Sequence, residues 1–247
     1  MEKLYQELAE IYNIMYQSFI DYDEEFAYYN EFLKKYNARQ ILEIGCGSGN
    51  MAKRILANNY NYTGVDISEP MLSIAKQQLP FASFMQADMR NFSVENKFDA
   101  VLIIGRSLSY ILSMEDLMQT FNCVHKSLNP NGTFFFDVID AKKFMPTIDS
   151  NKLIVHSMKH QNKIYTRESI FENASADDEC LWNWYAAYYV KEPTIEREQI
   201  AKDNTTLRSF KKEEIELILT QCGFRVLEIN ERPSYAFDTL VFCSQKK

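Results

Sequence analysis

The chain has 247 residues, of which 46% are apolar, and a formal charge of −7; this length and apolar content suit one α/β domain with an insertion. The lysines and arginines are scattered rather than gathered into a basic stripe, which counts against an RNA or DNA partner. The five cysteines are odd in number and widely spaced, without a CxxC pair, so we expect neither a disulfide framework nor a metal site.

No targeting or membrane segment is expected. The segment Met1–Glu7 is polar and acidic, unlike a signal peptide. The longest apolar run, 100–104, is far too short to cross a bilayer. We therefore expect a cytoplasmic protein without a membrane partner, and both a monomer and a homodimer remain open.

Residues 1–36 are predicted to form two helices, because apolar residues recur at three- and four-residue steps. The segment Asp21–Glu24 is a plausible start for the second helix. Tyr12 and Tyr16 lie one helical turn apart. Either they cover a ligand, or they are half-buried residues of an amphipathic helix.

Strands and helices then alternate, which predicts a parallel sheet with helices on both faces. Such a sheet binds its ligands beyond the carboxyl ends of its strands. The predicted strands are 40–44, 62–66, 82–86, 98–104 and 133–138, and the predicted helices are 50–57, 70–78 and 114–128.

From 141 to 206 the pattern changes to an inserted antiparallel sheet. Its three predicted strands are 163–172, 180–191 and 195–207. A helix over 211–222, ended by Gly223, and two strands at 224–230 and 240–244 then complete the main sheet.

A glycine loop follows the first predicted strand. Gly45, Gly47 and Gly49 are three of only seven glycines, and they stand directly before a helix. Such a loop turns sharply and lets a ligand approach main-chain N–H groups at the helix N-terminus. The pattern favours a nucleotide-like cofactor site over a plain strand-to-helix turn.

Carboxylates end the neighbouring strands. Asp66 comes 21 residues after Gly45, where a carboxylate accepts both hydroxyls of a ribose. The alternative role, helix capping, suits Ser68 better. Asp88 follows the next strand and is placed to accept from an exocyclic amine, unless it is a solvated loop residue.

The glycine spacing argues against a dinucleotide dehydrogenase. Such enzymes carry G-x-G-x-x-G, and position 50, where the third glycine would stand, is Asn50. Met71 and Met89 could flank a flat base, or they could be ordinary core residues.

Together these segments resemble the class I S-adenosylmethionine (SAM) dependent methyltransferases. The resemblance is carried by 42–49, 64–68, 71–72, 87–90, 97–99 and 128–132. The two N-terminal tyrosines, the segment 107–112 and the inserted sheet are similar to small-molecule N-methyltransferases. Among these, the chain resembles the amino-sugar N,N-dimethyltransferases and, more distantly, glycine N-methyltransferase.

This resemblance implies a Rossmann-like, doubly wound, seven-stranded and mostly parallel sheet with one antiparallel strand, plus the small inserted antiparallel sheet. Residues 1–140 would form a helical lid and the SAM-binding core. Residues 141–206 would form an acceptor cap, and 207–247 would complete the core.

The resemblance also assigns residues to parts of SAM. The three glycines would line the methionine part, and Glu43 would orient the loop. Asp66 would hold the ribose and Asp88 the adenine amine. The further implied cofactor-binding residues are Tyr12, Ile67, Met71, Met89, Ile104 and Gly105.

On the acceptor side, Tyr16 and Tyr110 are expected to position the substrate, and no general base is identified. Arg106, Ser107, Asp137 and Trp184 are the expected substrate-binding residues. Two features depart from the sugar enzymes. The segment 17–20, after the second tyrosine, lacks their arginine, and Arg106 stands where Phe or Asn is more usual. Arg106 would replace the lost charge, bind an anionic acceptor or face solvent.

The sequence thus predicts methyl transfer from SAM to a small soluble metabolite, at nitrogen rather than oxygen. A methyltransferase acting on protein or RNA, and a non-catalytic SAM-binding partner subunit, are the alternatives.

Overall fold

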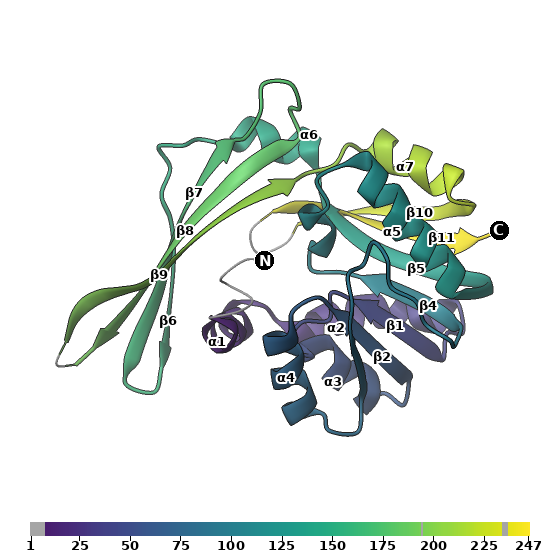
Figure 1. Ribbon diagram of the computed structural model, residues 1–247, viewed down its shortest axis with the longest axis horizontal. Helices are drawn as coiled ribbons and strands as arrows, with labels where there is room; N and C mark the ends of the chain where they lie inside the picture. The colour runs from purple at the N-terminus through teal and green to yellow at the C-terminus, as the bar shows by residue number, and fades with distance from the viewer. Residues whose placement is uncertain (1–7, 194, 234–236) are drawn as a thin grey trace.

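The computed structural model describes residues 8–193, 195–233 and 237–247, and the predicted start of the first helix at residues 1–7 lies outside them. It consists of an α/β core and a long antiparallel sheet that projects from it (Figure 1). Among the described residues, no helix is both long and apolar enough to cross a membrane.

The core is a seven-stranded sheet of the predicted class. Its strand order is β10-β11-β5-β4-β1-β2-β3, and only β11 runs antiparallel to its neighbours. The strands are β1 (Gln40–Ile44), β2 (Asn61–Asp66), β3 (Ser83–Gln86), β4 (Phe98–Ile103), β5 (Leu128–Ile139), β10 (Phe224–Pro233) and β11 (Asp238–Lys246).

Helices cover both faces of this sheet, as its mostly apolar central strands require. On one face, α2 (Tyr22–Lys35) and α3 (Asn50–Ala57) pack on Ile41, Ala100 and Leu102. On the other face, α5 (Met114–Ser127) and α7 (Lys212–Gln221) pack on the alternate residues of the same strands. The apolar residues of each strand are therefore buried on both sides.

Local signals in the sequence set the helix ends. Asp21 begins α2 by accepting from the backbone N–H groups of Asp23 and Glu24. Ser68 begins α4 (Glu69–Gln78) by accepting from Met71 N. Gly223, at φ +82°, follows the end of α7 as expected.

One strand begins earlier than predicted. It was expected to span 133–138, but β5 already begins at Leu128. Leu128 pairs with Phe98 of β4 across an irregular step in the register, and Asn131 takes a positive φ of 62°. Pairing with the parallel strand β4 therefore already begins at Leu128, before residues 129–132.

The projecting sheet has four strands in the order β6-β7-β8-β9, one more than the sequence predicted. They are β6 (Ile154–His160), β7 (Lys163–Asn173), β8 (Leu181–Glu192) and β9 (Ile195–Arg208). The missed strand, β6, is an edge strand in which Val155 on the solvent face is 52% exposed, so its alternation is weak. We call this sheet the cap sheet. The short α6 (Ala141–Phe144) and the 3-10 helix η3 (Met145–Thr147) connect it to β5.

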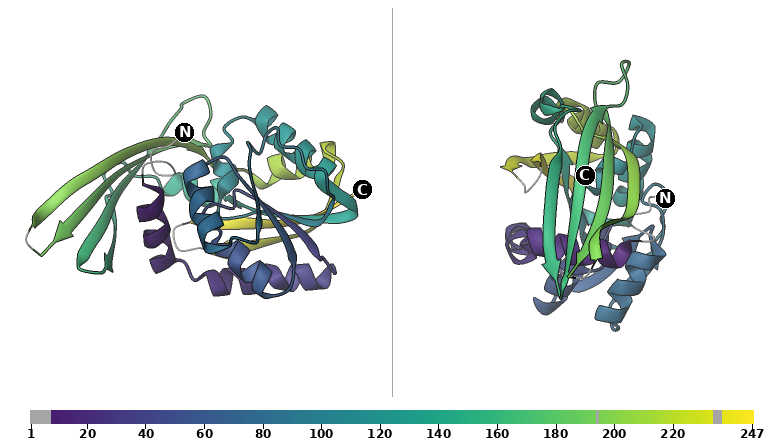
Figure 2. Two further views of the ribbon diagram at one scale, coloured as in Figure 1. Left: turned by 60° about the horizontal axis from the view of Figure 1, so that its bottom comes forward. Right: turned by 90° about the vertical axis from the view of Figure 1, so that its left-hand side faces the viewer.

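The N-terminal helix α1 (Ala9–Phe19) lies between the cap sheet and the core (Figures 1 and 2). Met15 and Tyr16 of α1 pack with Met158, Ala186 and Tyr188 of the cap sheet. The helix thus covers the carboxyl ends of the central strands, where the sheet's order reverses between β1 and β4.

Candidate cofactor and acceptor site

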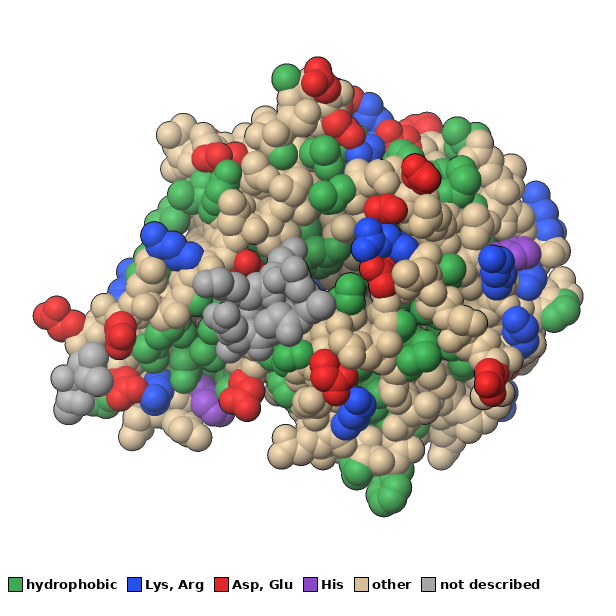
Figure 3. Space-filling view, in the orientation of Figure 1, with side chains coloured by type: hydrophobic (Ala, Val, Ile, Leu, Met, Phe, Trp, Pro, Cys, Tyr) green, Lys and Arg blue, Asp and Glu red, His purple; other side chains and the backbone are tan. Residues whose placement is uncertain are grey.

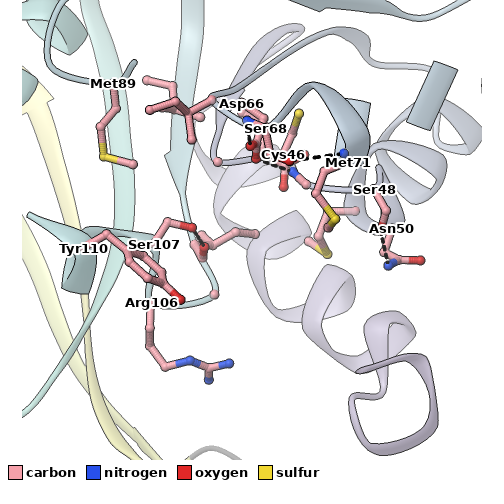
Figure 4. A pocket seen from close by; sticks show the side chains of 18 of the residues that line it. Cys46, Ser48, Asn50, Asp66, Ser68, Met71, Met89, Arg106, Ser107 and Tyr110 are labelled. Atoms are coloured by element: carbon pink, nitrogen blue, oxygen red, sulfur yellow. Dashed lines mark hydrogen bonds between the residues drawn. The ribbon is translucent and has the colours of Figure 1, made fainter. Parts of the chain in front are cut away.

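A pocket opens at the carboxyl ends of β1, β2 and β4, beneath α1. Its walls are the glycine loop after β1, the loops after β2, β3 and β4, and the tyrosines of α1 and α2. Figure 4 shows Asp66 and Ser68 together on one side. Arg106, Ser107 and Tyr110, from the turn after β4, lie across the cavity. The position is the one that a doubly wound sheet predicts for its ligand.

The glycine loop has left-handed backbone at three points. Gly45, Gly47 and Gly49 have φ of 76°, 53° and 81°, which side-chain-bearing residues rarely adopt. A Cβ at Gly45 would lie 2.7 Å from Ser107 Oγ. These glycines therefore leave open a space beside main-chain groups that a bulkier loop would fill.

Asp66, at the end of β2, fixes this loop by a hydrogen bond to its backbone. Its Oδ2 accepts from Gly47 N at 2.7 Å, and its Oδ1 accepts from Ser68 N at 2.9 Å. Each carboxylate oxygen has a further lone pair. The side chain can accept two more hydrogen bonds from a diol in the pocket.

Glu43 is a buried carboxyl group that lines the same pocket. Burial raises its pKa to about 8, the Asp66 charge adds to the rise, and the hydrogen bond from Tyr62 Oη at 2.6 Å opposes it. A cation in the pocket would stabilise the ionised form of Glu43, because a positive charge offsets the cost of ionising a buried carboxyl group.

Asp88 carries a partner that the sequence did not predict. Arg90 Nη2 lies 2.6 Å from Asp88 Oδ2, and Arg90 also contacts Asp116 at 3.2 Å. The hydrogen bonds from Arg90 lower the pKa of Asp88. The Asp88 carboxylate therefore stays ionised and oriented at the pocket edge.

Asp137 supports the turn after β4 rather than the pocket itself. Its fully buried carboxylate accepts from Arg106 N at 2.6 Å and from Gly105 N at 3.1 Å. Arg106 sits there at φ +66°, a strained value for a non-glycine residue. The two bonds to Asp137 hold that conformation, and the Arg106 side chain lines the pocket.

Most of the predicted site residues come together in this pocket. Those that line it are Tyr12, Tyr16, Glu43, Gly45, Gly47, Asp66, Ile67, Met71, Asp88, Met89, Ile104, Gly105, Arg106, Ser107 and Tyr110. Three do not line it. Gly49 packs against Ala75 of α4, Asp137 lies behind the turn, and Trp184 lies in the cap sheet.

The structure adds residues that the sequence reasoning missed. Tyr22, Ser48 and Asn50 line the pocket. Arg167 of β7 donates from Nη1 to Tyr16 Oη at 2.8 Å, and its guanidinium lies 5.0 Å from the Trp184 ring. The segment after Tyr16 has no arginine, and an arginine of the cap sheet contacts Tyr16 instead. Only the alternation of β7 indicated that Arg167 faces inward, and nothing in the sequence pairs it with Tyr16.

Comparison with known proteins decides the class. Residues 41–132, which contain the glycine loop, Asp66 and Asp88, match a family model described as a methyltransferase domain. Residues 41–132 therefore form a methyltransferase domain. The predicted enzyme class, a methyltransferase, is thereby confirmed.

The full length of this methyltransferase is similar to a putative methyltransferase, YqeM, of Bacillus subtilis. The two are 29% identical, over 94% of this chain and 98% of that protein. A shorter match, 32% identical over 38% of this chain and 40% of the relative, is to dTDP-3-amino-3,4,6-trideoxy-alpha-D-glucopyranose N,N-dimethyltransferase of Streptomyces venezuelae.

Solved structures show the same fold. Streptomyces venezuelae DesVI superposes with a TM-score of 0.82 at 22% identity, covering 95% of this methyltransferase and 97% of that chain. A SAM-dependent methyltransferase from Clostridium acetobutylicum gives a TM-score of 0.77 at 21% identity, covering 97% and 98% of the two chains. The match includes the cap sheet, since it spans nearly the whole chain.

Proposed function

We propose that this enzyme transfers a methyl group from SAM to a small metabolite, at nitrogen rather than oxygen. The observation that carries the proposal is one pocket that joins the glycine loop and Asp66 to a tyrosine-rich wall under α1. The amino-sugar N,N-dimethyltransferases among the similar proteins support the choice of nitrogen.

In this proposal Gly45 and Gly47 line the methionine part of SAM, with Glu43 near its ammonium group. Asp66 accepts from the ribose hydroxyls, with Ile67 beside the base. Asp88 takes the adenine amine. The open space beside the glycine loop and the unused lone pairs of Asp66 fit these groups.

The acceptor would lie between α1 and the turn after β4. Tyr16 and Tyr110 would orient it, and Arg106 and Ser107 would bind its polar groups. Asp137 would act through the Arg106 backbone, and Trp184 would act through Arg167, behind Tyr16. Stacked Tyr12 and Tyr16, with ring centroids 3.9 Å apart, present aromatic surface that attracts a cation.

Bound SAM supplies an electrophilic methyl group. The residues of this chain have to hold the acceptor's lone pair in line and exclude water, a positioning effect that can contribute several kcal/mol. The pocket lies under α1, which limits access of water from that side. No side chain is assigned as a general base, since an amine can arrive deprotonated.

The surface supports a small acceptor over RNA. The chain carries a formal charge of −7, and the face in Figure 3 shows acidic and basic side chains interspersed rather than a basic stripe. RNA binding draws its affinity from such a stripe. We also place the enzyme in the cytoplasm, where its five free cysteines stay reduced.

The cofactor site is tested by titration calorimetry with SAM. We expect Asp66→Ala to weaken SAM binding about 30-fold, since two hydrogen bonds to a charged group are lost. Asp149→Ala, at an exposed turn, serves as the matched control. Equal affinity in Asp66→Ala and wild type would show that the site assignment is wrong.

The acceptor is tested with labelled SAM against amino sugars, other amines, carboxylates and a lysate treated with nuclease or protease. Label transfer to an amine supports the proposal. Label on RNA or protein alone would contradict a small-molecule acceptor. A chain that binds SAM and methylates nothing would be a non-catalytic subunit.

A further inference from the structure

A polar cluster joins α1 to the glycine loop. The side-chain oxygen of Asn13, on α1, accepts from Ser48 Oγ at 2.7 Å, from Gln17 Nε2 at 3.0 Å and from Asn50 Nδ2 at 3.1 Å. Asn50 Nδ2 also donates to Ser48 Oγ at 3.1 Å, a bond drawn in Figure 4. Gln17 Nε2 donates to Asn50 Oδ1 at 2.9 Å. Four side chains from two distant segments therefore form one connected network.

Ser48 is the side chain by which this part of the loop can be held. It stands between Gly47 and Gly49, which have no side chains and take left-handed φ. It is 3% exposed, and its hydroxyl is directed to Asn13. A glycine-rich segment restrains itself poorly, so its position depends on the groups that bind it.

The loop has two such restraints, on opposite sides. Asp66 Oδ2 holds Gly47 N from the strand side at 2.7 Å. Asn13 holds Ser48 from the helix side and is itself only 9% exposed. Buried hydrogen bonds of this kind are costly to break without replacement.

We propose that Asn13 is a positioning residue for the cofactor, holding the glycine loop in its SAM-binding shape through Ser48. The inference rests on the assignment of the loop to SAM under Proposed function, and extends the cofactor site to a helix outside the matched methyltransferase domain. Asn13 itself does not line the pocket. It acts through Ser48 and Asn50, which do.

The position of α1 also depends on the cap sheet. Tyr16, three residues after Asn13, accepts from Arg167 of β7 at 2.8 Å. One face of α1 therefore binds the glycine loop through Asn13 while its next turn binds the cap sheet. Any movement of α1 away from the core would release Ser48.

The experiment measures SAM affinity by calorimetry in Asn13→Ala, Ser48→Ala and the double variant. We expect at least a tenfold loss in each single variant. The SAM affinity of the double variant should lie within threefold of that of the weaker-binding single variant, because both changes remove the same hydrogen bond. Glu10→Ala is the matched control: Glu10 is an exposed residue of the same helix, outside the network that joins Asn13 to Ser48 and Asn50. It should stay within threefold of wild type.

A second readout separates positioning from a general loss of stability. Hydrogen exchange of the 9–19 amides should slow when SAM binds wild type, and this SAM-dependent protection should be absent in Asn13→Ala. A purely structural role would raise exchange with and without SAM alike.

The outcomes separate this inference from the proposed function. If wild type binds SAM, Asp66→Ala binds it more weakly, and Asn13→Ala binds like wild type, the inference is overturned and the cofactor site stands. The inference is also overturned if the loss of SAM affinity in the double variant equals the product of the losses in the two single variants. If wild type fails to bind SAM, the proposed function fails first and the inference with it.

Discussion

Glu43 is a carboxyl group held away from water at the end of β1, where Tyr62 donates to it. Its folded pKa of about 8 lies above its ordinary value of 4.5. Between these two values the folded protein binds more protons than the unfolded chain. The free energy of unfolding therefore falls as the pH rises through this window.

Replacing Glu43 by Gln should remove this dependence. We expect Glu43→Gln to unfold with about the same free energy as wild type at pH 5, and to be more stable by roughly 4 kcal/mol at pH 8.5, because Gln keeps an acceptor for Tyr62 without a buried charge. Urea denaturation of the SAM-free proteins at both pH values measures the difference. If the two proteins differ by the same free energy of unfolding at both pH values, Glu43 does not titrate in this range.

Gly64 is needed for space, whereas Gly105 is needed for backbone conformation. A Cβ at Gly64 would lie 2.8 Å from Cys46 Sγ, Phe84 Cδ1 and Tyr62 Oη. At Gly105 a Cβ would meet nothing within 4 Å, but the φ is +71°. The two positions separate steric crowding from backbone strain.

We expect Gly64→Ala to lower the free energy of unfolding by about 3 kcal/mol, because the strand is crowded on three sides. Gly105→Ala should cost about 1 kcal/mol through strain alone. Chemical denaturation of both variants checks the contrast. An equal loss at the two sites would mean that β2 shifts to make room.

At the level of secondary-structure elements, α1 contacts the cap sheet around an arginine of β7. Arg167 is 3% exposed and lies 5.4 Å and 5.7 Å from the Tyr16 and Phe19 rings. Its Nη2 is also 3.3 Å from His156 Nδ1 of β6. One β7 side chain thus contacts both α1 and the neighbouring strand.

Removing this arginine should loosen α1. Arg167→Met is expected to lower the free energy of unfolding by about 2 kcal/mol, since a charged donor to Tyr16 is lost. Arg197→Met is the control: Arg197 also stacks on a tyrosine and pairs with a carboxylate, but its side chain is 44% exposed, so its loss should cost under about 0.5 kcal/mol. Thermal unfolding of both variants measures the effect, and equal losses would contradict a special role for Arg167.

The whole molecule is expected to gain stability when its cofactor binds. A ligand at 100 times its Kd adds about 2.7 kcal/mol. For a chain of this size that corresponds to a rise in Tm of about 5–10 °C. Scanning fluorimetry with SAM should show this rise, and NAD should not, because position 50 is not the glycine that a dinucleotide site requires.

The Asp66→Ala variant provides the control for this measurement. At the same SAM concentration its Tm should rise by less than half the wild-type shift. A full shift in the variant would place SAM elsewhere on the protein.

Local signals in the sequence were enough to predict the core. The alternation of apolar runs with capped helices predicted β1 and α3 to the residue, and the spacing of Gly45, Asp66 and Asp88 predicted the cofactor class. These features depend on residues close together in the chain. The edge strand β6 was missed because its polar, half-exposed residues lack the alternation of a buried strand.

The tertiary structure alone decided how distant side chains meet. Arg167 stands 151 positions after Tyr16 and binds it, and Asn13 binds Ser48 across 35 positions. Asp137 was expected to touch the acceptor, yet it lies behind the Arg106 turn. Such contacts depend on how α1 and the cap sheet pack on the core, and no local pattern encodes that packing. The sequence by itself therefore determined the fold class and the enzyme class, while the shape of the acceptor end was decided by the packing of three separate segments.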